Sequence, residues 1–470
     1  MNCANEFVFY TIDFFIDFFY NRSHIFRKTM IITNAVKFKV IEDSEEWLQY
    51  FANHAGCHRF VYNHFAKLNI DKFNDNNDKD YLLSYQSMDL LLTQLKKEYT
   101  FLNNVHSQML QKATKDVSRG IKQFFKDINN KIPRKRLLKF KKKYDDQSFT
   151  LPNQTTYNYL KDENGNKTIK KESKNFKFIH NYKVFNKPKV CYLKIPKLKT
   201  PIKILKHKDF EGEIKNVTFS KKGDCYYVSL QLEQSINELP ENNKISSIGI
   251  DLGVKRLINT SDNEIFKPVE NYDKWQAKLK KAQRKLAKTT KFSNNFKKLK
   301  LKINKLHRKI SQIRLDYLHK ISTYLVNNHA NIIVEKLNVK NMTKSAKGDS
   351  ENHGKNVKQK SGLNRSILEQ GWGIFKTLLK YKSTWYNSHF EEVNPKNTSL
   401  KCCQCDKVHK ENRQQQAVFK CTSCGFSINA DFNAALNILY LGLLKLGLLK
   451  EEAQLEVNKR ISNQELLTNL

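Results

Sequence analysis

The most telling stretch of this sequence reads Cys402-Cys403-Gln404-Cys405, then, after fifteen residues, Cys421-Thr422-Ser423-Cys424-Gly425, and shortly afterwards Asp431-Phe432-Asn433. Two C-x-x-C pairs at this separation predict a tetrahedral zinc site, because each pair forms a tight turn that directs both sulfurs to one point. Gly425 suits such a turn. Cys403 lies inside the first pair and is not expected to reach the same metal. The alternatives are four buried free thiols or a disulfide pair.

The other cysteines show no spacing that would indicate a disulfide framework. They are Cys3, Cys57, Cys191, Cys225 and Cys403. Their scatter favours a reducing compartment. The apolar run at residues 7–20 is too short to span a bilayer and contains Asp13 and Asp17, so it predicts neither a membrane helix nor a signal peptide. We therefore expect a soluble, cytoplasmic protein, nucleoid-associated in a bacterium, with no membrane partner.

Three carboxylates are candidates for a shared site, and two of them stand in predicted buried strands, where a charge is costly. Asp251 interrupts the apolar strand expected over residues 245–260, and Glu335 lies in a second buried strand at residues 331–337. Asp431 opens a short helix after the cysteine pairs. Taken singly, Asp431 could be a helix N-cap and Glu335 a strand-end salt bridge. Together, two acids in buried strands and one at a helix start favour convergence on two divalent ions.

The ligand types separate two kinds of metal site. Oxygen ligands favour Mg²⁺ or Mn²⁺, whereas a thiolate cage favours Zn²⁺. In a catalytic pair of ions, about 4 Å apart, one ion activates a water and the other stabilises the leaving oxygen of a phosphodiester. The predicted ligands are Asp251, Glu335 and Asp431 for catalytic magnesium, and Cys402, Cys405, Cys421 and Cys424 for structural zinc.

The charge of the chain points to a polyanionic partner. The 470 residues include 84 basic and 46 acidic ones, a formal net charge of +38. Codon bias of an AT-rich genome explains part of the lysine content but not the shortage of acids. Self-repulsion of this size disfavours a compact state unless a polyanion neutralises it, so nucleic acid is the expected partner.

Two stretches concentrate the cations. Residues 134–143 hold seven in ten positions, and residues 272–310 hold fifteen with the single acid Asp273. In the second stretch apolar residues recur at steps of three and four from Leu299 to Leu325, which predicts a helical hairpin with an apolar seam and a cationic outer face. A charge run is often only a solvated face, but its single sign favours phosphate contact. The expected contacts are Arg134, Lys135, Arg136, Lys139, Lys141, Lys142, Lys297, Lys298, Lys300 and Lys302.

The remaining patterns outline an α+β multidomain protein. A strand is expected after Met30, a helix over residues 45–65 and further helices over 81–130. From 149 to 233, short alternating segments separated by turn residues indicate an antiparallel sheet or small barrel. Residues 343–362 lack an apolar period and are expected to be a mobile loop.

In combination, these motifs resemble the split RuvC nuclease of the TnpB family, transposon-encoded, RNA-guided endonucleases similar to type V CRISPR effectors. The resemblance covers about residues 31 to 440. The motifs that carry it are Ile248-Gly-Ile-Asp251-Leu-Gly-Val254, Ile333-Val-Glu335-Lys-Leu337, the cysteine pairs followed by Asn429-Ala-Asp431-Phe-Asn-Ala-Ala-Leu-Asn437, and the segments Gly56–Asn63, Val105–Gln111, Gln312–Lys320 and Leu363–Trp372. Only their combination is specific.

The resemblance implies an RNase H-like (RuvC) nuclease core split by a helical hairpin and a zinc ribbon, with an N-terminal β-barrel wedge domain interrupted by a helical recognition lobe. The implied segments are an extension without assigned role (1–29), a wedge strand (30–44), the recognition lobe (45–148), the wedge β-barrel (149–235), the RuvC nuclease (245–400, helical insertion 272–330, mobile loop 343–362), the zinc ribbon (401–428), the RuvC C-terminal helix (429–450) and a tail (451–470). Asp406 stands where the family usually has a glycine. Residues 1–29 and the repeated Leu-Gly-Leu-Leu-Lys unit at 441–450 have no recognised counterpart.

Similar proteins bind an RNA derived from the end of their own element and cut both strands of DNA beside a short adjacent motif. For this chain the resemblance implies a magnesium-dependent, RNA-guided endodeoxyribonuclease encoded by a transposable element, a monomer with a guide RNA and double-stranded target DNA as partners. Two alternatives remain open. One is a catalytically idle RNA-guided DNA-binding protein, which the three intact acids disfavour; the other is a guide-free transposon nuclease or transposase accessory protein.

Overall fold

The chain forms two compact units, one up to Glu238 and one from Leu239 onward. Both combine helices with sheets, so the predicted α+β class is confirmed. The computed structural model describes residues 30–468 except 77, 131–135, 144–145, 154, 162–166, 174–175, 181–188, 237–243, 245, 270–271, 349–352 and 414. Within these residues, no helix has the length and apolar character needed to cross a membrane. The extension expected at residues 1–29 lies outside the described part.

The N-terminal unit surrounds one large sheet with helices. Its elements are β1 (Met30–Val40), α1 (Glu45–Asn76), η1 (Lys79–Tyr81), α2 (Tyr85–Glu98), η2 (Thr100–Asn104), α3 (Ser107–Asn129), β2 (Gln147–Pro152), β3 (Thr155–Lys161), β4 (Lys167–Ser173), β5 (Lys177–His180), β6 (Lys189–Lys194), β7 (Ile202–Lys206), β8 (Glu213–Lys222) and β9 (Cys225–Ile236).

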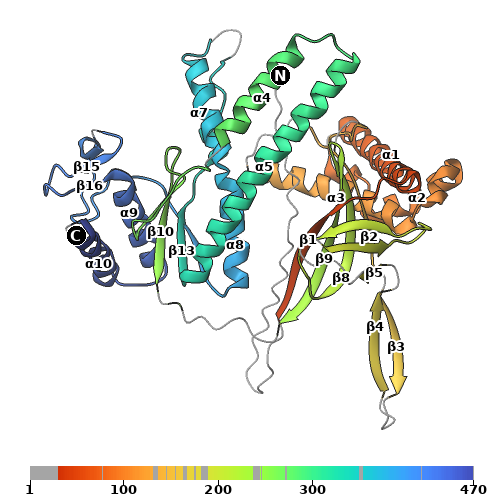
Figure 1. The fold of residues 1–470 in the computed structure, drawn as a ribbon, viewed down its shortest axis with the longest axis horizontal. Coiled ribbons are helices and arrows are strands. Elements are labelled where there is room, and N and C mark those ends of the chain that lie inside the picture. The colour runs from red at the N-terminus through yellow and green to blue at the C-terminus, as the bar shows by residue number, and fades with distance from the viewer. Residues whose placement is uncertain are drawn as a thin grey trace. The chain divides into compact units, whose positions relative to one another are not determined.

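The strand predicted after Met30 occupies the middle of this sheet. The strand order is β2-β8-β9-β1-β7-β6-β5, and all the neighbours are antiparallel (Figure 1). β1 pairs with β9 along its whole length, from Met30 opposite Ile236 to Val40 opposite Tyr226. The predicted antiparallel sheet is confirmed. In the part of the chain that is described, no pairing joins β2 to β5, so the strand order is that of an open sheet.

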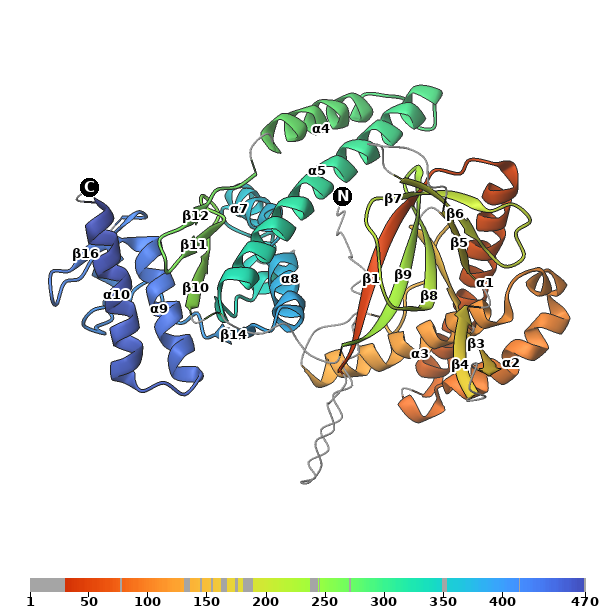
Figure 2. The ribbon, with the colours of Figure 1, turned by 60° about the horizontal axis from the view of Figure 1, so that its bottom comes forward.

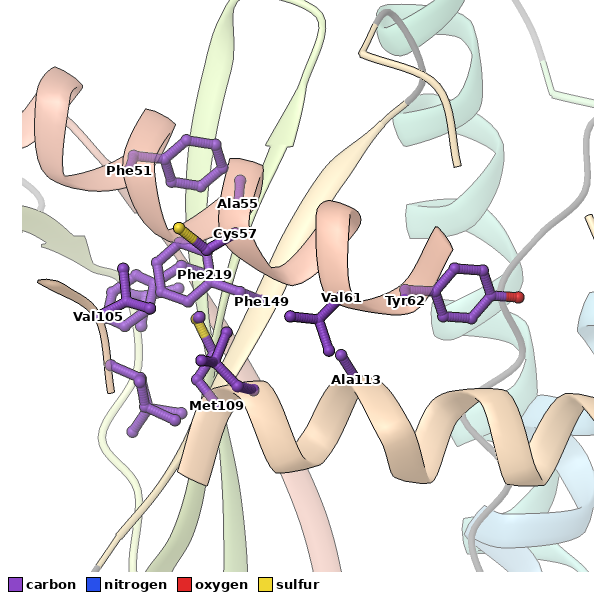
Figure 3. Close-up of a cluster of buried hydrophobic side chains, with 14 of the residues drawn as sticks. Phe51, Ala55, Cys57, Val61, Tyr62, Val105, Met109, Ala113, Phe149 and Phe219 are labelled. Atoms are coloured by element: carbon purple, nitrogen blue, oxygen red, sulfur yellow. The ribbon is translucent and has the colours of Figure 1, made fainter. Parts of the chain in front are cut away.

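The helices of this unit share one hydrophobic core with the sheet. α1 directs Phe51 and Val61 inward, α3 contributes Met109, and the strands contribute Phe149 and Phe219 (Figure 3). The ring centroids of Phe51 and Phe149 lie 5.4 Å apart. Aromatic rings at this distance stabilise the core beyond the burial of their area alone. The expected helical lobe therefore does not have a core of its own.

Two helix boundaries differ from the sequence prediction. α1 runs eleven residues past residue 65, to Asn76, and its last turns are held by the ring of Phe73 against that of Phe124, 5.8 Å away. The helical region over 81–130 is broken into α2 and α3. The hydroxyl of Ser84 caps α2 by accepting a hydrogen bond from the Ser87 N–H, a signal that sequence reasoning overlooked.

The C-terminal unit has a smaller mixed sheet. Its elements are β10 (Ser247–Leu252), β11 (Ile258–Thr260), β12 (Ile265–Phe266), α4 (Tyr272–Ala287), α5 (Asn294–Asn328), β13 (Asn331–Glu335), α6 (Val339–Met342), α7 (Val357–Gln370), α8 (Trp372–Trp385), β14 (His389–Val393), η3 (Lys410–Arg413), β15 (Val418–Lys420), β16 (Ser427–Asn429), α9 (Ala430–Lys445) and α10 (Lys450–Thr468).

Helices cover both faces of this sheet. The strand order is β12-β11-β10-β13-β14, with β10, β13 and β14 parallel. Ile248, Ile250, Ile332 and Val334 pack against α5 and α8, whereas Ile333 packs against α9. This alternation follows from the two-residue period of a strand. Figures 1 and 2 both show α9 on one side of β10 and α5 and α8 on the other.

The predicted helical hairpin is confirmed. α4 and α5 close on a small apolar seam whose buried members are Leu279, Ala282, Ile303, Leu306 and Ile310. The second half of α5 leaves this seam and packs on the sheet through Leu318, Ile321 and Leu325. One continuous apolar stripe of α5 therefore packs first against α4 and then against the sheet.

Two expectations for the middle of this unit are wrong. The single strand over 245–260 is two antiparallel strands, because a tight turn between them is closed by the N–H of Gly253 donating to the carbonyl of Leu257. The loop expected over 343–362 ends early, since α7 begins at Val357. Ile367 is the buried residue recorded for α7, so the helix has almost no apolar period by which to recognise it.

The C-terminal region, for which the sequence predicted a helix over 429–450 and left 451–470 without an assigned structure, forms two helices. α9 continues through the first Leu-Gly-Leu-Leu-Lys unit and ends before Gly447, whose φ of 96° suits a helix stop. α10 follows and buries Ala453, Val457 and Ile461, spaced by four residues, in the same hydrophobic cluster as α9. Three apolar residues at this spacing, among many charged ones, are a weak signal for predicting a helix from the sequence.

Candidate carboxylate and metal sites

The structure brings the two cysteine pairs together. The Sγ atoms of Cys402, Cys405, Cys421 and Cys424 all lie within 4.8 Å of one another. Cys402 and Cys424 are 3.8 Å apart, and Cys405 and Cys421 are 3.5 Å apart. A tetrahedral zinc site with Zn–S bonds of about 2.3 Å has sulfurs about 3.8 Å apart, so this spacing fits zinc. None of the four is disulfide-bonded, which excludes the disulfide alternative, and Cys403 packs in a separate hydrophobic cluster against α9.

Both cysteine pairs have the same backbone turn. In the first, the N–H of Asp406 donates to the carbonyl of Cys402 at 3.0 Å; in the second, the N–H of Gly425 donates to that of Cys421 at 3.0 Å. The residue that closes each turn is left-handed, with a φ of 63° at Asp406 and 76° at Gly425. The family's glycine therefore falls at a position that needs positive φ, and here an aspartate adopts that conformation.

Asp251 and Glu335 lie at the ends of neighbouring parallel strands. The register of β10 and β13 pairs Ile250 with Val334, and the two carboxylates come directly after that pair. Asp431 is the second residue of α9, the helix that covers this face of the sheet. The carboxyl ends of parallel strands are a common place for a ligand site.

Electrostatics shows that the three acids interact. Burial, and then the negative charges of Glu335 and Asp431, raise the pKa of Asp251 to about 7, while Arg413 opposes this shift. Burial also raises the pKa of Glu335, which is 7% exposed. The carboxylates are less tightly gathered than the sulfurs, since within the described residues only the four cysteines form a group within 4.8 Å.

The raised pKa of Asp251, caused first by burial and then by the charges of Glu335 and Asp431, is the observation that tests a divalent-cation site. A bound cation would offset both the burial of the Asp251 carboxylate and its repulsion by the other two acids. Their oxygen atoms are the donors that Mg²⁺ and Mn²⁺ prefer. The residues present therefore fit such ions.

Asn429, rather than Asp431, caps α9. Its Oδ1 accepts hydrogen bonds from the N–H groups of Asp431 and Phe432, at 3.1 and 3.2 Å. The carboxylate of Asp431 instead contacts the guanidinium of Arg413 at 3.2 Å. The simple reading of Asp431 as an N-cap is therefore wrong.

A buried hydrogen-bond network joins Glu335 to the cysteine segment. The hydroxyl of Thr398 donates to Glu335 Oε1 at 2.5 Å, and the carbonyl of Thr398 accepts from Asn437 at 2.9 Å. Asn437 and Asn433 both donate to the carbonyl of Lys401, the residue before the first cysteine, at 2.8 Å. Glu335 thus accepts a hydrogen bond from the Thr398 hydroxyl in place of the strand-end salt bridge considered from the sequence.

Sequence reasoning missed Thr398, Arg413, Asn433 and Asn437. The two asparagines had a visible signal, because they stand four residues apart on the buried side of an apolar helix. Thr398 and Arg413 had no such signal in the sequence, because each contacts its acidic partner only in the folded chain.

The two cationic stretches differ in how far their side chains are engaged. Lys297, Lys298, Lys300 and Lys302 are exposed on α5. Lys141 lies 3.8 Å from Asp116 and over the ring of Tyr62, and the Asn63 side chain makes two hydrogen bonds with its backbone. The Gly56–Asn63 motif thus holds the basic segment in place. Arg134 and Lys135 lie outside the described residues. Nucleic-acid contact by any of these side chains stays a prediction.

Comparison with known proteins identifies the family. Residues 227–346 match the family OrfB_IS605, described as "Probable transposase", and residues 372–438 match the Cas12f1-like TNB domain. A protein of Escherichia coli K12 named "Putative RNA-guided DNA endonuclease InsQ" is 36% identical over 83% of this chain and 87% of its own length. A Streptomyces pristinaespiralis protein named "Putative RNA-guided DNA endonuclease" is 27% identical over 83% and 84%.

The two family matches place the chain in a class of transposon-associated proteins with a Cas12f1-like TNB domain near the C-terminus. The chain belongs to the TnpB family. Among solved structures, a Cas12f1–sgRNA–target DNA complex is similar, with a TM-score of 0.48 at 15% identity over 87% of this chain and 98% of that one.

Proposed function

We propose that this chain is an RNA-guided DNA endonuclease of a transposable element, which hydrolyses phosphodiester bonds at the site formed by Asp251, Glu335 and Asp431. The observation that carries the proposal is the electrostatic coupling of these acids at the ends of β10, β13 and the start of α9. The names of the relatives in Escherichia coli and Streptomyces pristinaespiralis support the same activity. An idle binding protein has no need of a buried carboxylate placed beside two other acids.

Asp251, Glu335 and Asp431 would hold magnesium or manganese. When bound, such a pair of ions activates a water and stabilises the leaving oxygen of the DNA strand. The protein's own contribution is orientation. Thr398 fixes one oxygen of Glu335 and leaves the other available, and α9 carries Asp431 to the strand ends. Arg413 neutralises part of the charge at Asp431.

The four cysteines would hold a structural zinc ion. Its binding would fix the segment 401–428 against α9, because Lys401 is tied to Asn433 and Asn437. We assign residues 245–400 to a RuvC-type nuclease with the helical insertion 272–330, and 429–450 to its C-terminal helix. Residues 30–44 and 149–235 would form the wedge domain, with 45–148 as the recognition lobe.

The partners we propose are an RNA encoded by the element and a double-stranded DNA target beside a short adjacent motif. In such systems base pairing with the guide reads the sequence, and the protein holds the backbone. We propose that one chain suffices for one RNA. A guide-free nuclease is the alternative, and the test must distinguish it from an RNA-guided one.

The test measures plasmid cleavage by purified protein with Mg²⁺, with and without RNA transcribed from the element's end. We expect cutting only with RNA and a matching target. Asp251→Ala, Glu335→Ala and Asp431→Ala should each lower the cleavage rate at least a thousandfold while RNA binding persists. Asp316→Asn, which removes an exposed acid of α5, is the matched control and should cut normally. Specific cutting without RNA would contradict guidance, and cutting by the acid variants would contradict the site.

A further inference from the structure

Phe292 lies at the tip of the α4–α5 hairpin and is 81% exposed, more than any other large hydrophobic side chain recorded in the described part of the chain. The tip is far from the sheet of its own unit in both ribbon views (Figures 1 and 2). An exposed aromatic ring keeps a large apolar surface in water, at a cost of free energy. A binding partner that covers the ring would recover this free energy.

The apolar seam of the hairpin does not use this ring. The seam consists of Leu279, Ala282, Ile303, Leu306 and Ile310, with Trp275 and Leu286 packed against it. Phe296, the third residue of α5, is the ring near Phe292, with centroids 6.3 Å apart. A hydrophobic cluster is thus available in the same hairpin, yet Phe292 stays outside it.

The backbone holds Phe292 in a conformation that is unfavourable for it. Its φ is 67°, in the left-handed region that bulky residues rarely adopt. The turn around it is defined: the N–H of Ser293 donates to the carbonyl of Thr290, and the Ser293 hydroxyl caps α5 by accepting from the N–H of Phe296. Strain of this kind, maintained by its surroundings, is commonest at functional positions.

Cations surround the exposed ring. Lys288 and Lys291 precede it in the turn, and Lys297 and Lys298 follow it in the first turn of α5, all exposed. The stretch 272–310 has fifteen Lys or Arg residues and one acid, at its far end. An aromatic ring set among cations offers two contacts at once, a stacking face for a base and charges for the adjoining phosphates.

We propose that Phe292 is a base-stacking residue, on which an unpaired nucleobase of a bound nucleic acid strand lies while the flanking lysines hold its backbone. This rests on the proposed function only in taking nucleic acid as the partner. The shared chemistry is a nucleobase on a phosphodiester chain, and RNA and DNA are its two possible sources.

The test is an affinity cycle with full-length protein, inactivated by Asp251→Ala, and fluorescent single strands of equal length. One strand carries bases and the other is abasic, each as RNA and as DNA. We expect Phe292→Ala to weaken binding of the base-bearing strand about fivefold or more, the lower end for the loss of one aromatic–base stack. Binding of the abasic strand should not change. Phe292→Trp should bind at least as tightly as the parent.

Two controls separate stacking from structure. Phe292→Gly relieves the strained φ, so it should melt at an equal or higher temperature while losing the same affinity as Phe292→Ala. Leu301→Ala removes an apolar side chain that is 49% exposed on the same hairpin and should leave both affinities unchanged. The strand type with the larger loss identifies the source of the base.

Equal affinities of Phe292→Ala and its parent for the base-bearing strands would overturn the inference, as would an equal loss on the abasic strands. A change in oligomeric state in place of strand affinity would overturn it in favour of a protein partner. If the parent protein bound neither strand, the proposed function itself would fail, and this outcome differs from all the others.

Discussion

At the scale of single residues, the two cysteine turns both need a residue with positive φ, and they use different residue types for it. Asp406 and Gly425 both sit at positive φ. Asp406 also faces Lys401 at 2.8 Å, but its side chain is 53% exposed, so this ion pair contributes little. We expect Asp406→Gly to leave the free energy of unfolding within about 1 kcal/mol of wild type, on the stabilised side.

The matched change is Gly425→Ala, which forces a Cβ into the left-handed region and should cost about 1–2 kcal/mol. Both variants are measured by thermal unfolding of the zinc-loaded protein, with zinc content determined separately. A clear loss of zinc from Asp406→Gly would mean that the aspartate does more than close the turn.

The raised pKa of Asp251 predicts a pH dependence of stability. Between its ordinary pKa near 4 and its folded pKa of about 7, the folded protein keeps a proton that the unfolded chain has released. Stability therefore falls as pH rises through this window. Thermal unfolding at pH 5.5 and 8, without Mg²⁺ and without chelators that would remove zinc, should show a higher melting temperature at pH 5.5.

Asp251→Asn is the control for this effect and should flatten the profile. Added Mg²⁺ should raise the melting temperature more at pH 8 than at pH 5.5, since protonation of Asp251 competes with the ion. A profile that keeps its slope in Asp251→Asn would assign the pH dependence to another group.

The candidate site was open to sequence reasoning only in part. Asp251 and Glu335 are visible because a carboxylate interrupts an apolar strand, and the four cysteines because of their spacing. Thr398 is 63 positions from Glu335 in the chain, and its hydroxyl is brought there by a loop. No periodicity encodes such a contact.

At the scale of elements, the sheet and α9 approach each other through glycine. A Cβ on Gly249 would lie 2.3 Å from the carbonyl oxygen of Ala435 and 2.6 Å from the N–H nitrogen of Leu439. Backbone atoms of a helix cannot yield separately, so α9 would have to shift and take Asp431 with it. Gly249→Ala should destabilise the protein by about 1–3 kcal/mol and reduce cleavage.

Gly362→Ala is the matched control, because a Cβ there meets nothing within 4 Å and the residue lies inside α7. It should be neutral or stabilising by about 0.5–1 kcal/mol. Urea unfolding and cleavage rates of the two variants check this. Normal cleavage by Gly249→Ala would show that the position of Asp431 tolerates a shift of α9.

Elements with a strong period were predictable, and the others were not. The α4–α5 hairpin has an apolar stripe and an outer face of one charge sign. Both patterns are visible in the local sequence, so the hairpin could be predicted. α7 and α10 bury few side chains, and the division of residues 245–260 into β10 and β11 depends on one turn. The division of β10 and β11 depends on a local turn and α10 on packing against the preceding helix α9, and neither leaves a strong periodic signal in the sequence.

At the scale of the whole molecule, a net charge of +38 has to be matched by a partner, and the exposed hairpin lysines are the place to test this. Replacing Lys297, Lys298, Lys300 and Lys302 by Gln should lower the slope of log affinity against log salt. Each lost phosphate contact removes roughly 0.7–0.9, so four remove about 3. Phosphate contacts carry no base information, so the cleaved target should not change.

Four exposed lysines outside the hairpin form a control of equal charge: Lys340, Lys396, Lys420 and Lys450, each replaced by Gln. If the hairpin is a nucleic-acid surface, its variant loses far more of the slope than this control, although both lose four charges. Equal losses would mean that net charge, rather than this surface, drives binding. A changed choice of target in the hairpin variant would show that these lysines read bases, which guide pairing should otherwise do alone.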